Sequence, residues 1–151
     1  MASPEDCTVV ARMNGLGDAI EFVEAFCADR GISPSDALRL SLVVEELFTN
    51  TVVHGHAGGS DAPVRLALRA DDSRLELSYQ DRAPPFDPVA HATRATVDPA
   101  AGLGDRPIGQ LGLTLVVDMA ERISYAREDG CNRIRLALRR EPVLSKPGDP
   151  A

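Results

Sequence analysis

The feature that most limits how this chain can fold is a set of strands that each have a single apolar face. Residues 64–79 alternate apolar and polar side chains on either side of a turn at Asp71-Asp72-Ser73. Residues 123–139 repeat this pattern around Asp129-Gly130. Because each strand can bury only one face, the helices of the chain must all cover the same side of the sheet.

Helical patterns occupy most of the remaining sequence. An amphipathic helix is expected from about residue 18 to residue 30, after a short strand over residues 7–13. A second helix begins with the capping residue Ser33, followed by Pro34, and runs to about residue 54 before Gly55. A third, short apolar helix is expected over residues 111–120.

The element order β-α-α-β-β-loop-α-β-β predicts an α/β (α+β) two-layer sandwich. We expect a mixed, mainly antiparallel sheet covered on one face by helices. Residues 1–140 are expected to form one domain and residues 141–151 a flexible C-terminal tail. Residues 81–112 lack regular periodicity and are rich in proline and glycine, which indicates a functional loop, with residues 88–108 as a lid.

The composition excludes several classes of protein. The chain has 151 residues and a net charge of −7, so neither DNA nor an anionic membrane surface is an expected partner. It has no tryptophan and few aromatic residues, which argues against a single-stranded nucleic-acid binder. The three cysteines lack metal-site spacing, and no signal peptide or membrane-length apolar run is present, so a cytoplasmic protein with free thiols is expected.

Three polar side chains interrupt the apolar second helix. Glu46, Asn50 and His54 are spaced i, i+4, i+8, which places them on one helical face. A carboxylate and a carboxamide are costly to bury without partners, so a bound ligand is the natural explanation for them. Glu45 lies on a different face and is interpreted as a surface residue.

Two further motifs follow downstream. Asp81-Arg-Ala-Pro-Pro-Phe-Asp87-Pro comes directly after a strand, and Gly109-Gln-Leu-Gly112-Leu113 opens a helix. Glycines permit close backbone approach, and the free N–H groups at a helix start bind phosphate. With the polar stripe around Glu46, they resemble the N box and the two glycine boxes of the GHKL superfamily of ATP-binding proteins, which has the Bergerat fold. More closely, they resemble its anti-sigma factor serine kinases of the RsbW and SpoIIAB type.

This resemblance implies ATP and Mg²⁺ as ligands and assigns roles to individual residues. Glu46 would be the catalytic base, Asn50 the Mg²⁺ ligand and Asp81 the residue that accepts a hydrogen bond from the adenine amine. Gly109 and Gly112 would be the hinges of the phosphate loop. The full set of nucleotide-binding candidates is Asn50, Asp81, Ala83, Pro85, Phe86, Gly109, Gln110, Leu111, Gly112 and Leu113.

The function that the resemblance implies is a protein serine/threonine kinase of a partner-switching system. It would phosphorylate a small STAS-type antagonist, the anti-anti-sigma protein, and would otherwise sequester a sigma factor. A homodimer is expected by family analogy alone. The alternative is a non-catalytic module of the same fold that acts by partner contact. The catalytic domain of a sensor histidine kinase is a third possibility, but the chain carries no segment with a phospho-accepting histidine.

One departure from the family pattern lies in the first glycine box. The family often has Asp-x-Gly-x-Gly, whereas this chain has Ala83 and Pro85 at the two glycine positions. Ala83 adds a methyl group where the base edge of ATP would pass, and Pro85 stiffens the loop. His54 is interpreted mainly as a helix-end residue, and three histidines are too few for an expected zinc site.

Overall fold

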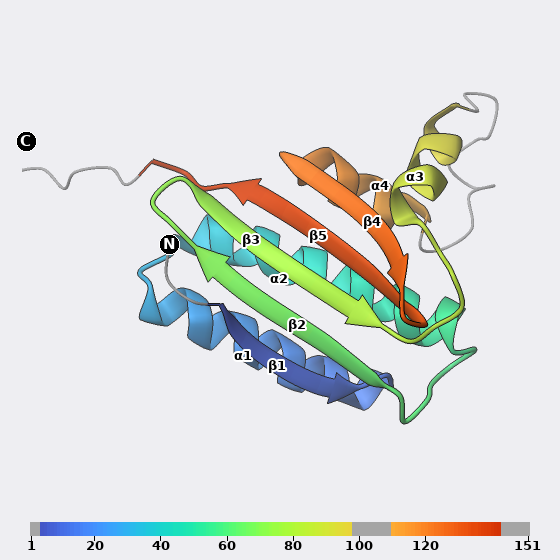
Figure 1. Ribbon diagram of the computed structural model, residues 1–151. Coiled ribbons are helices and arrows are strands. Elements are labelled where there is room, and N and C mark those ends of the chain that lie inside the picture. Colours follow the sequence, from blue (N-terminus) through green and yellow to red (C-terminus); the bar gives the residue numbers. More distant parts are fainter. Residues whose placement is uncertain (1–3, 98–109, 143–151) are drawn as a thin grey trace, which may run out of the picture.

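The computed structural model describes residues 4–97 and 110–142, without the side chains of 93–97, 110 and 111. In this part of the chain, five strands form one sheet that lies against a layer of helices (Figure 1). In sheet order the strands are β1 (Glu5–Val10), β2 (Pro63–Ala70), β3 (Arg74–Asp81), β5 (Cys131–Arg139) and β4 (Arg122–Glu128). The helical segments are η1 (Met13–Gly15), α1 (Leu16–Asp29), α2 (Pro34–Thr49), η2 (Asn50–Gly55), α3 (Pro88–Val97) and α4 (Gln110–Met119).

The two-layer α/β sandwich expected from the strand pattern is confirmed. Helices α1, α2 and α4 lie behind one face of the sheet in Figure 1, and the other face is open toward the viewer. Every pairing between the described strands is antiparallel, so the sheet is not mixed. Along β2, Val64, Leu66 and Leu68 are buried while Arg65 and Arg69 are exposed, as the alternation predicts.

The hydrophobic core lies between the sheet and α2. Leu40 and Phe48 of α2 are fully buried, and Phe26 of α1 joins them. Leu77 of β3 and Leu136 of β5 face each other across the strand pair and complete the layer. Full burial of one such side chain stabilises the folded state by about 1.5–3 kcal/mol. Because α2 contributes several of them, it is the central element of the helical layer.

The start of α2 is tied to the end of β5 through a buried carboxylate. Ser33 caps the helix by accepting a hydrogen bond from the Asp36 N–H at 3.1 Å, as the sequence predicts. The Asp36 side chain is 1% exposed and accepts hydrogen bonds from Arg39 Nη2 at 2.7 Å and from the Glu141 N–H at 2.9 Å. Arg39 also donates to the carbonyl oxygen of Arg139, so both residues hold the chain end against α2.

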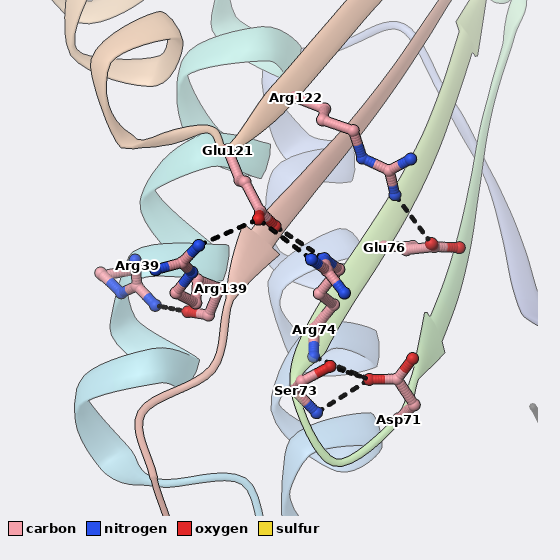
Figure 2. Close-up of polar contacts among 8 residues, drawn as sticks. All are labelled: Arg39, Asp71, Ser73, Arg74, Glu76, Glu121, Arg122 and Arg139. Carbon is pink, nitrogen blue, oxygen red and sulfur yellow. Dashed lines mark hydrogen bonds and ion pairs between the residues drawn. The ribbon is translucent and has the colours of Figure 1, made fainter.

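The turn between β2 and β3 and the start of β4 are held by a second set of polar contacts (Figure 2). Asp71 accepts hydrogen bonds from the backbone N–H groups of Ser73 and Arg74, both at 2.8 Å. The carboxylate of Glu121 accepts from Arg74 Nε at 2.7 Å and from Arg139 Nη2 at 3.3 Å. These contacts join β3, β4 and β5 at the end of the sheet where β3 begins and β5 ends.

Two helix boundaries differ from the sequence-based expectations. The second helix ends as an α-helix at Thr49 and continues as a π-helical segment, η2, to Gly55. The segment expected to be an irregular loop is helical over Pro88–Val97, where it forms helix α3, and its expected role as a lid stays a prediction. Asp87 Oδ1 accepts from the N–H groups of Val89 and Ala90 at 2.9 and 3.2 Å, so Asp87-Pro88 is a helix start that the proline content obscured.

Other expectations differ only at the margins or lie outside the described residues. The first strand covers residues 5–10 and is followed by the short helix η1, instead of extending to residue 13. The second half of the expected lid, residues 98–109, and most of the expected tail, residues 143–151, are outside the described residues. No helix within the described ranges is long and apolar enough to cross a membrane.

The Asp36 contacts predict a specific dependence of stability on pH. Burial raises the pKa of Asp36, but the hydrogen bonds from Arg39 and from the Glu141 N–H outweigh it and lower that pKa below its usual value. The stabilisation is therefore complete above about pH 4 and is lost as the pH falls through the depressed folded-state value. Asp36→Asn should lower the free energy of unfolding at pH 7 by about 1–3 kcal/mol.

The measurement is urea denaturation at pH 7 and pH 3, with Asp72→Asn as the control for an exposed carboxylate. The difference between wild type and Asp36→Asn should shrink at pH 3, while Asp72→Asn should follow wild type at both values. An equal loss for Asp36→Asn at both pH values would contradict the assigned role of the carboxylate.

Candidate nucleotide-binding site

The site begins where α2 changes into the π-helical segment η2. The N–H of Asn50 donates to the carbonyl oxygens of both Glu46 and Leu47, and the His56 N–H donates to Thr51 O at 3.0 Å, an i to i+5 spacing. Single π-helical turns within α-helices are rare and frequent at functional sites. The wider turn places Asn50, Thr51 and Gly55 together on the wall of one pocket.

This pocket has a volume of about 140 Å³ within the described residues. It lies between η2, the end of β3 and the loop that follows β3. Its lining comprises Leu47, Asn50, Thr51, His54, Gly55, Tyr79, Asp81, Ala83, Pro84, Pro85, Phe86, Pro88, Asn132 and Ile134. Asn50 and His54 of the polar stripe thus share one pocket with the first glycine box, about 30 residues away in the sequence.

The carboxylate of Asp81 is the polar centre of the pocket. It is 5% exposed and accepts hydrogen bonds from Thr51 Oγ1 at 2.7 Å, from Asn132 Nδ2 at 2.9 Å and from the Ala83 N–H at 3.1 Å. All three neighbours are placed as donors, so Asp81 acts purely as an acceptor. Oδ2 receives only the Thr51 bond and keeps acceptor capacity for a ligand in the pocket.

A buried tyrosine lies behind this carboxylate. The Tyr79 hydroxyl oxygen is 2.6 Å from Thr51 Oγ1 and 3.3 Å from the Leu47 carbonyl oxygen, which is also 3.0 Å from Thr51 Oγ1. When the single hydroxyl hydrogen of Thr51 points to Asp81, Tyr79 is the donor to Thr51. Burial raises the pKa of Tyr79 above its usual value, so the hydroxyl keeps its proton and this chain of donors persists at neutral pH.

Asn132 organises the loop after β3. Its Nδ2 donates to the carbonyl oxygens of Ala83 and Pro84 at 3.2 and 3.0 Å, in addition to Asp81. Its Oδ1 accepts from Tyr125 Oη at 2.6 Å and from the Phe86 N–H at 3.1 Å. Sequence reasoning missed Asn132, and its signal lies in the strand register, which pairs Asp81 directly with Asn132.

The altered first glycine box is compensated on the facing segment. Ala83 is 3% exposed, and a Cβ atom on Gly55 would lie 2.7 Å from the Ala83 Cβ. That distance is shorter than non-bonded carbon atoms allow, so the methyl group of Ala83 occupies the space that a side chain at position 55 would need. The methyl group of Ala83 in the loop therefore fits the space left by the absent side chain of Gly55 in η2.

Glu46 meets the second glycine box instead of lining the pocket. A Cβ atom on Gly112 of α4 would lie 1.8 Å from Glu46 Oε2, so glycine is required wherever this carboxylate takes its present position. Burial raises the pKa of Glu46 above its usual range, and the adjacent charge of Glu45 adds to this effect. Glu45 itself is exposed, as expected.

Glu46 and Asn50 share an uncommon property. Each is half-buried, and neither side chain makes a hydrogen bond or ion pair to any residue of the described ranges. They lie one helical turn apart, beside the pocket that contains Asp81. Both side chains are therefore available to a ligand that has a cation as well as anionic groups.

The remaining candidates fall in three places. Pro85 and Phe86 line the pocket, whereas Leu113 is 2% exposed and packs in the hydrophobic core. Gln110 and Leu111 belong to α4, but their side chains are outside the described part, and Gly109 lies outside it altogether. His54 is exposed at the pocket wall, and the described residues contain no group of His, Cys, Asp and Glu suited to a metal ion.

The chain belongs to the histidine kinase-like ATPase domain family, which residues 9–138 match. No curated protein matches the sequence. The chain is similar in fold to the RsbU and RsbW domains of Rv1364c from Mycobacterium tuberculosis, with 18% identity and a TM-score of 0.63. That match covers 96% of this chain and 35% of the Rv1364c chain, so this chain spans about a third of its length.

Two further solved structures share the fold. A chain of the SiaB-SiaC complex from Pseudomonas aeruginosa is 13% identical with a TM-score of 0.59, and the match covers 89% of this chain and 88% of that one. The catalytic domain of histidine kinase ThkA is 12% identical with a TM-score of 0.50, covering 91% and 99% of the two chains. The GHKL resemblance of the three motifs is thereby confirmed at the level of family and fold.

The contact between Gly55 and Ala83 predicts a compensating pair of substitutions. Gly55→Ala should lower the free energy of unfolding by about 1–3 kcal/mol, because two methyl groups cannot occupy the same space. Adding Ala83→Gly should restore most of the loss. Thermal unfolding of the two single variants and the double variant measures the coupling, with Gly17→Ala as the control because open space surrounds that position. Additive effects of the two substitutions would contradict the contact.

Proposed function

We propose that this protein is an ATP- and Mg²⁺-dependent protein serine/threonine kinase of the anti-sigma factor type. The observation that carries the proposal is the pair of unpartnered side chains, Glu46 and Asn50, beside the Asp81 pocket and against α4. Family membership supports ATP as the nucleotide. Phosphoryl transfer from ATP requires a pocket for the adenine ring, a ligand for the cation and a carboxylate near the phosphates, and the site offers candidates for all three.

Asp81 would hold the adenine ring. Its carboxylate has three protein donors and spare capacity on Oδ2, so it can accept the exocyclic amine of adenine. A purine with a carbonyl group at that position would present an acceptor to an acceptor, which disfavours guanine nucleotides. The Thr51, Tyr79 and Asn132 contacts would keep the carboxylate in place.

Asn50 would supply the protein ligand to Mg²⁺. A hard cation prefers oxygen ligands and keeps several waters, so one carboxamide oxygen together with phosphate oxygens is a suitable set. Mg²⁺ would neutralise the charge on the phosphate groups during transfer. Backbone N–H groups at the beginning of α4 would bind the phosphates, since helix starts favour anions.

Glu46 would act as the base. As the serine or threonine hydroxyl of the substrate attacks the γ-phosphate, its proton would pass to the Glu46 carboxylate and the bond between the γ- and β-phosphates would break, leaving ADP. Burial against Gly112 raises the pKa of Glu46, which makes the carboxylate a stronger base than an exposed glutamate.

The partners are proposed from the resemblance and from the fold relatives. The likeness to an RsbW domain and to a chain of the SiaB-SiaC complex supports a partner-switching role. We propose a STAS-type antagonist protein as the phosphorylated substrate, a sigma factor as the sequestered partner, a homodimer as the active form and the cytoplasm as its location. Residues 1–140 would act as one domain. The altered first glycine box keeps the non-catalytic module as the alternative.

The Glu46 assignment predicts loss of catalysis without loss of folding. Glu46→Gln keeps the shape that packs against Gly112 but cannot accept the proton, so kcat for phosphorylation of a STAS-domain protein should fall about 100-fold or more. Glu45→Gln is the matched control because it removes the neighbouring, exposed carboxylate. Equal rates for Glu46→Gln and wild type would remove Glu46 from the mechanism.

The raised pKa of Glu46 also predicts the shape of the pH profile. Protonated Glu46 cannot act as a base, so kcat should fall as the pH decreases through a value above about 4.3, the usual value for glutamate. Glu45→Gln removes a negative charge that raises the pKa, so it should move this limb to lower pH. An unchanged limb in Glu45→Gln would contradict the proposed titrating group.

The Asn50 assignment is tested by binding alone. Asn50→Ala should weaken binding of Mg-ATP about tenfold or more, which corresponds to at least about 1.4 kcal/mol. Alanine favours helix, so the variant should fold. Isothermal titration with and without Mg²⁺ measures the effect, with Thr49→Ala as the control for the adjacent position outside the pocket lining. If the wild-type protein binds Mg-ATP but transfers no phosphate to a STAS-domain protein, the result would support the non-catalytic module.

A further inference from the structure

The open face of the sheet carries a second hollow, far larger than the nucleotide pocket. It has a volume of about 730 Å³ and extends over β2, β3, β5 and β4 on the side that faces the viewer in Figure 1. Its lining comprises Pro4, Arg65, Ala67, Arg69, Glu76, Leu77, Ser78, Gln80, Arg122, Ile123, Ser124, Arg133, Arg135, Leu136 and Ala137. None of these residues lines the nucleotide pocket, so the two sites are separate.

Small side chains form part of the floor of this hollow. Ala67 of β2 pairs with Ser78 of β3, and Ser124 of β4 lies in the same row, separated from Ser78 by Arg135 of β5. Ala137 of β5 is in the next row. The small side chains of Ala67 and Ser78 on neighbouring strands leave room beside Arg135, where another element can approach the backbone of the sheet closely.

Arginines surround that floor. Five arginines and a single carboxylate, Glu76, line the hollow, although the whole chain carries a net charge of −7. One of the five, Arg65, is paired with Asp6 outside the lining. Glu76 is shared between Arg69 at 2.7 Å and Arg122 at 3.3 Å, the second of which Figure 2 shows. One carboxylate cannot neutralise two guanidinium groups, so this part of the rim stays positive.

Arg135 is the least compensated of the five. It is exposed on β5, between Ser78 of β3 and Ser124 of β4, and it has no ion pair or hydrogen bond to any residue in the described ranges. By contrast, Arg133 is bound by Glu128 at 2.9 Å and by Gln80 at 3.1 Å. A planar guanidinium without a partner beside a floor of small residues is suited to bidentate capture of a carboxylate.

We propose that this basic face, defined by Arg65, Arg69, Arg122, Arg133 and Arg135, is a docking surface for a glutamate- and aspartate-rich helix of another protein. Its charge is complementary to such a helix, and an amphipathic helix can place small apolar side chains on the floor and carboxylates on the rim. A two-fold pair of this chain would bring the same arginines together, which opposes a homodimer through this face. The negative total charge and the lack of aromatic lining residues oppose nucleic acid.

The test uses a fluorescein-labelled helical peptide of about 20 alanine and glutamate residues, which is about 30 Å long. Fluorescence anisotropy should show binding to the full chain that weakens with added salt, and no binding of the same peptide with glutamine for glutamate. Arg135→Glu should weaken binding about tenfold or more, while Arg135→Lys should retain most of it. Arg12→Glu, an equal charge reversal at an exposed arginine outside the hollow, should have no effect.

Equal affinity of wild type and Arg135→Glu for the peptide would overturn the proposal. So would tighter binding of a single-stranded oligonucleotide with the same dependence on Arg135, or a dimer in sedimentation velocity that Arg135→Glu dissociates. Asn50→Ala should leave peptide binding unchanged, because Asn50 is not part of this face. The peptide result is therefore independent of whether the proposed kinase function holds.

Discussion

The carboxylate of Asp81 joins three parts of the chain that are far apart in the sequence. Thr51 approaches it from the π-helical segment, Asn132 from the start of β5, and the Ala83 N–H from the loop after β3. A buried carboxylate without donors would be strongly unfavourable, so these three bonds are a condition for the pocket to exist. They also leave the carboxylate as an oriented acceptor, which is the property that the proposed binding of a nucleotide base would require of it.

Two glycines bring the motifs of this family into contact. Gly112 makes room for the Glu46 carboxylate, and Gly55 makes room for the methyl group of Ala83. In both places a side chain on one element occupies the space that a Cβ atom on the other would need. The motifs are therefore complementary surfaces, and a change in one of them, such as alanine in the first glycine box, is accommodated by its partner segment.

The two faces of the sheet have different chemistry because the helices cover only one of them. The covered face contributes Leu77 and Leu136 to the core, and the candidate nucleotide pocket lies at one end of that layer. The open face keeps the arginines that alternate with the buried residues of β2 and β5. The same period-two pattern that creates the core thus creates a basic surface on an acidic protein.

The sequence by itself determined the two-layer fold, the strand pairs, the capped start of α2 and the three motifs, because these depend on periodicity and on residues that are neighbours along the chain. Tertiary structure alone decided that Asn132 faces Asp81, that Gly55 faces Ala83, and that α2 widens into a π-helical turn at Asn50. The two contacts depend on strand register and on the packing of segments that are far apart in the sequence, which a local sequence pattern cannot report.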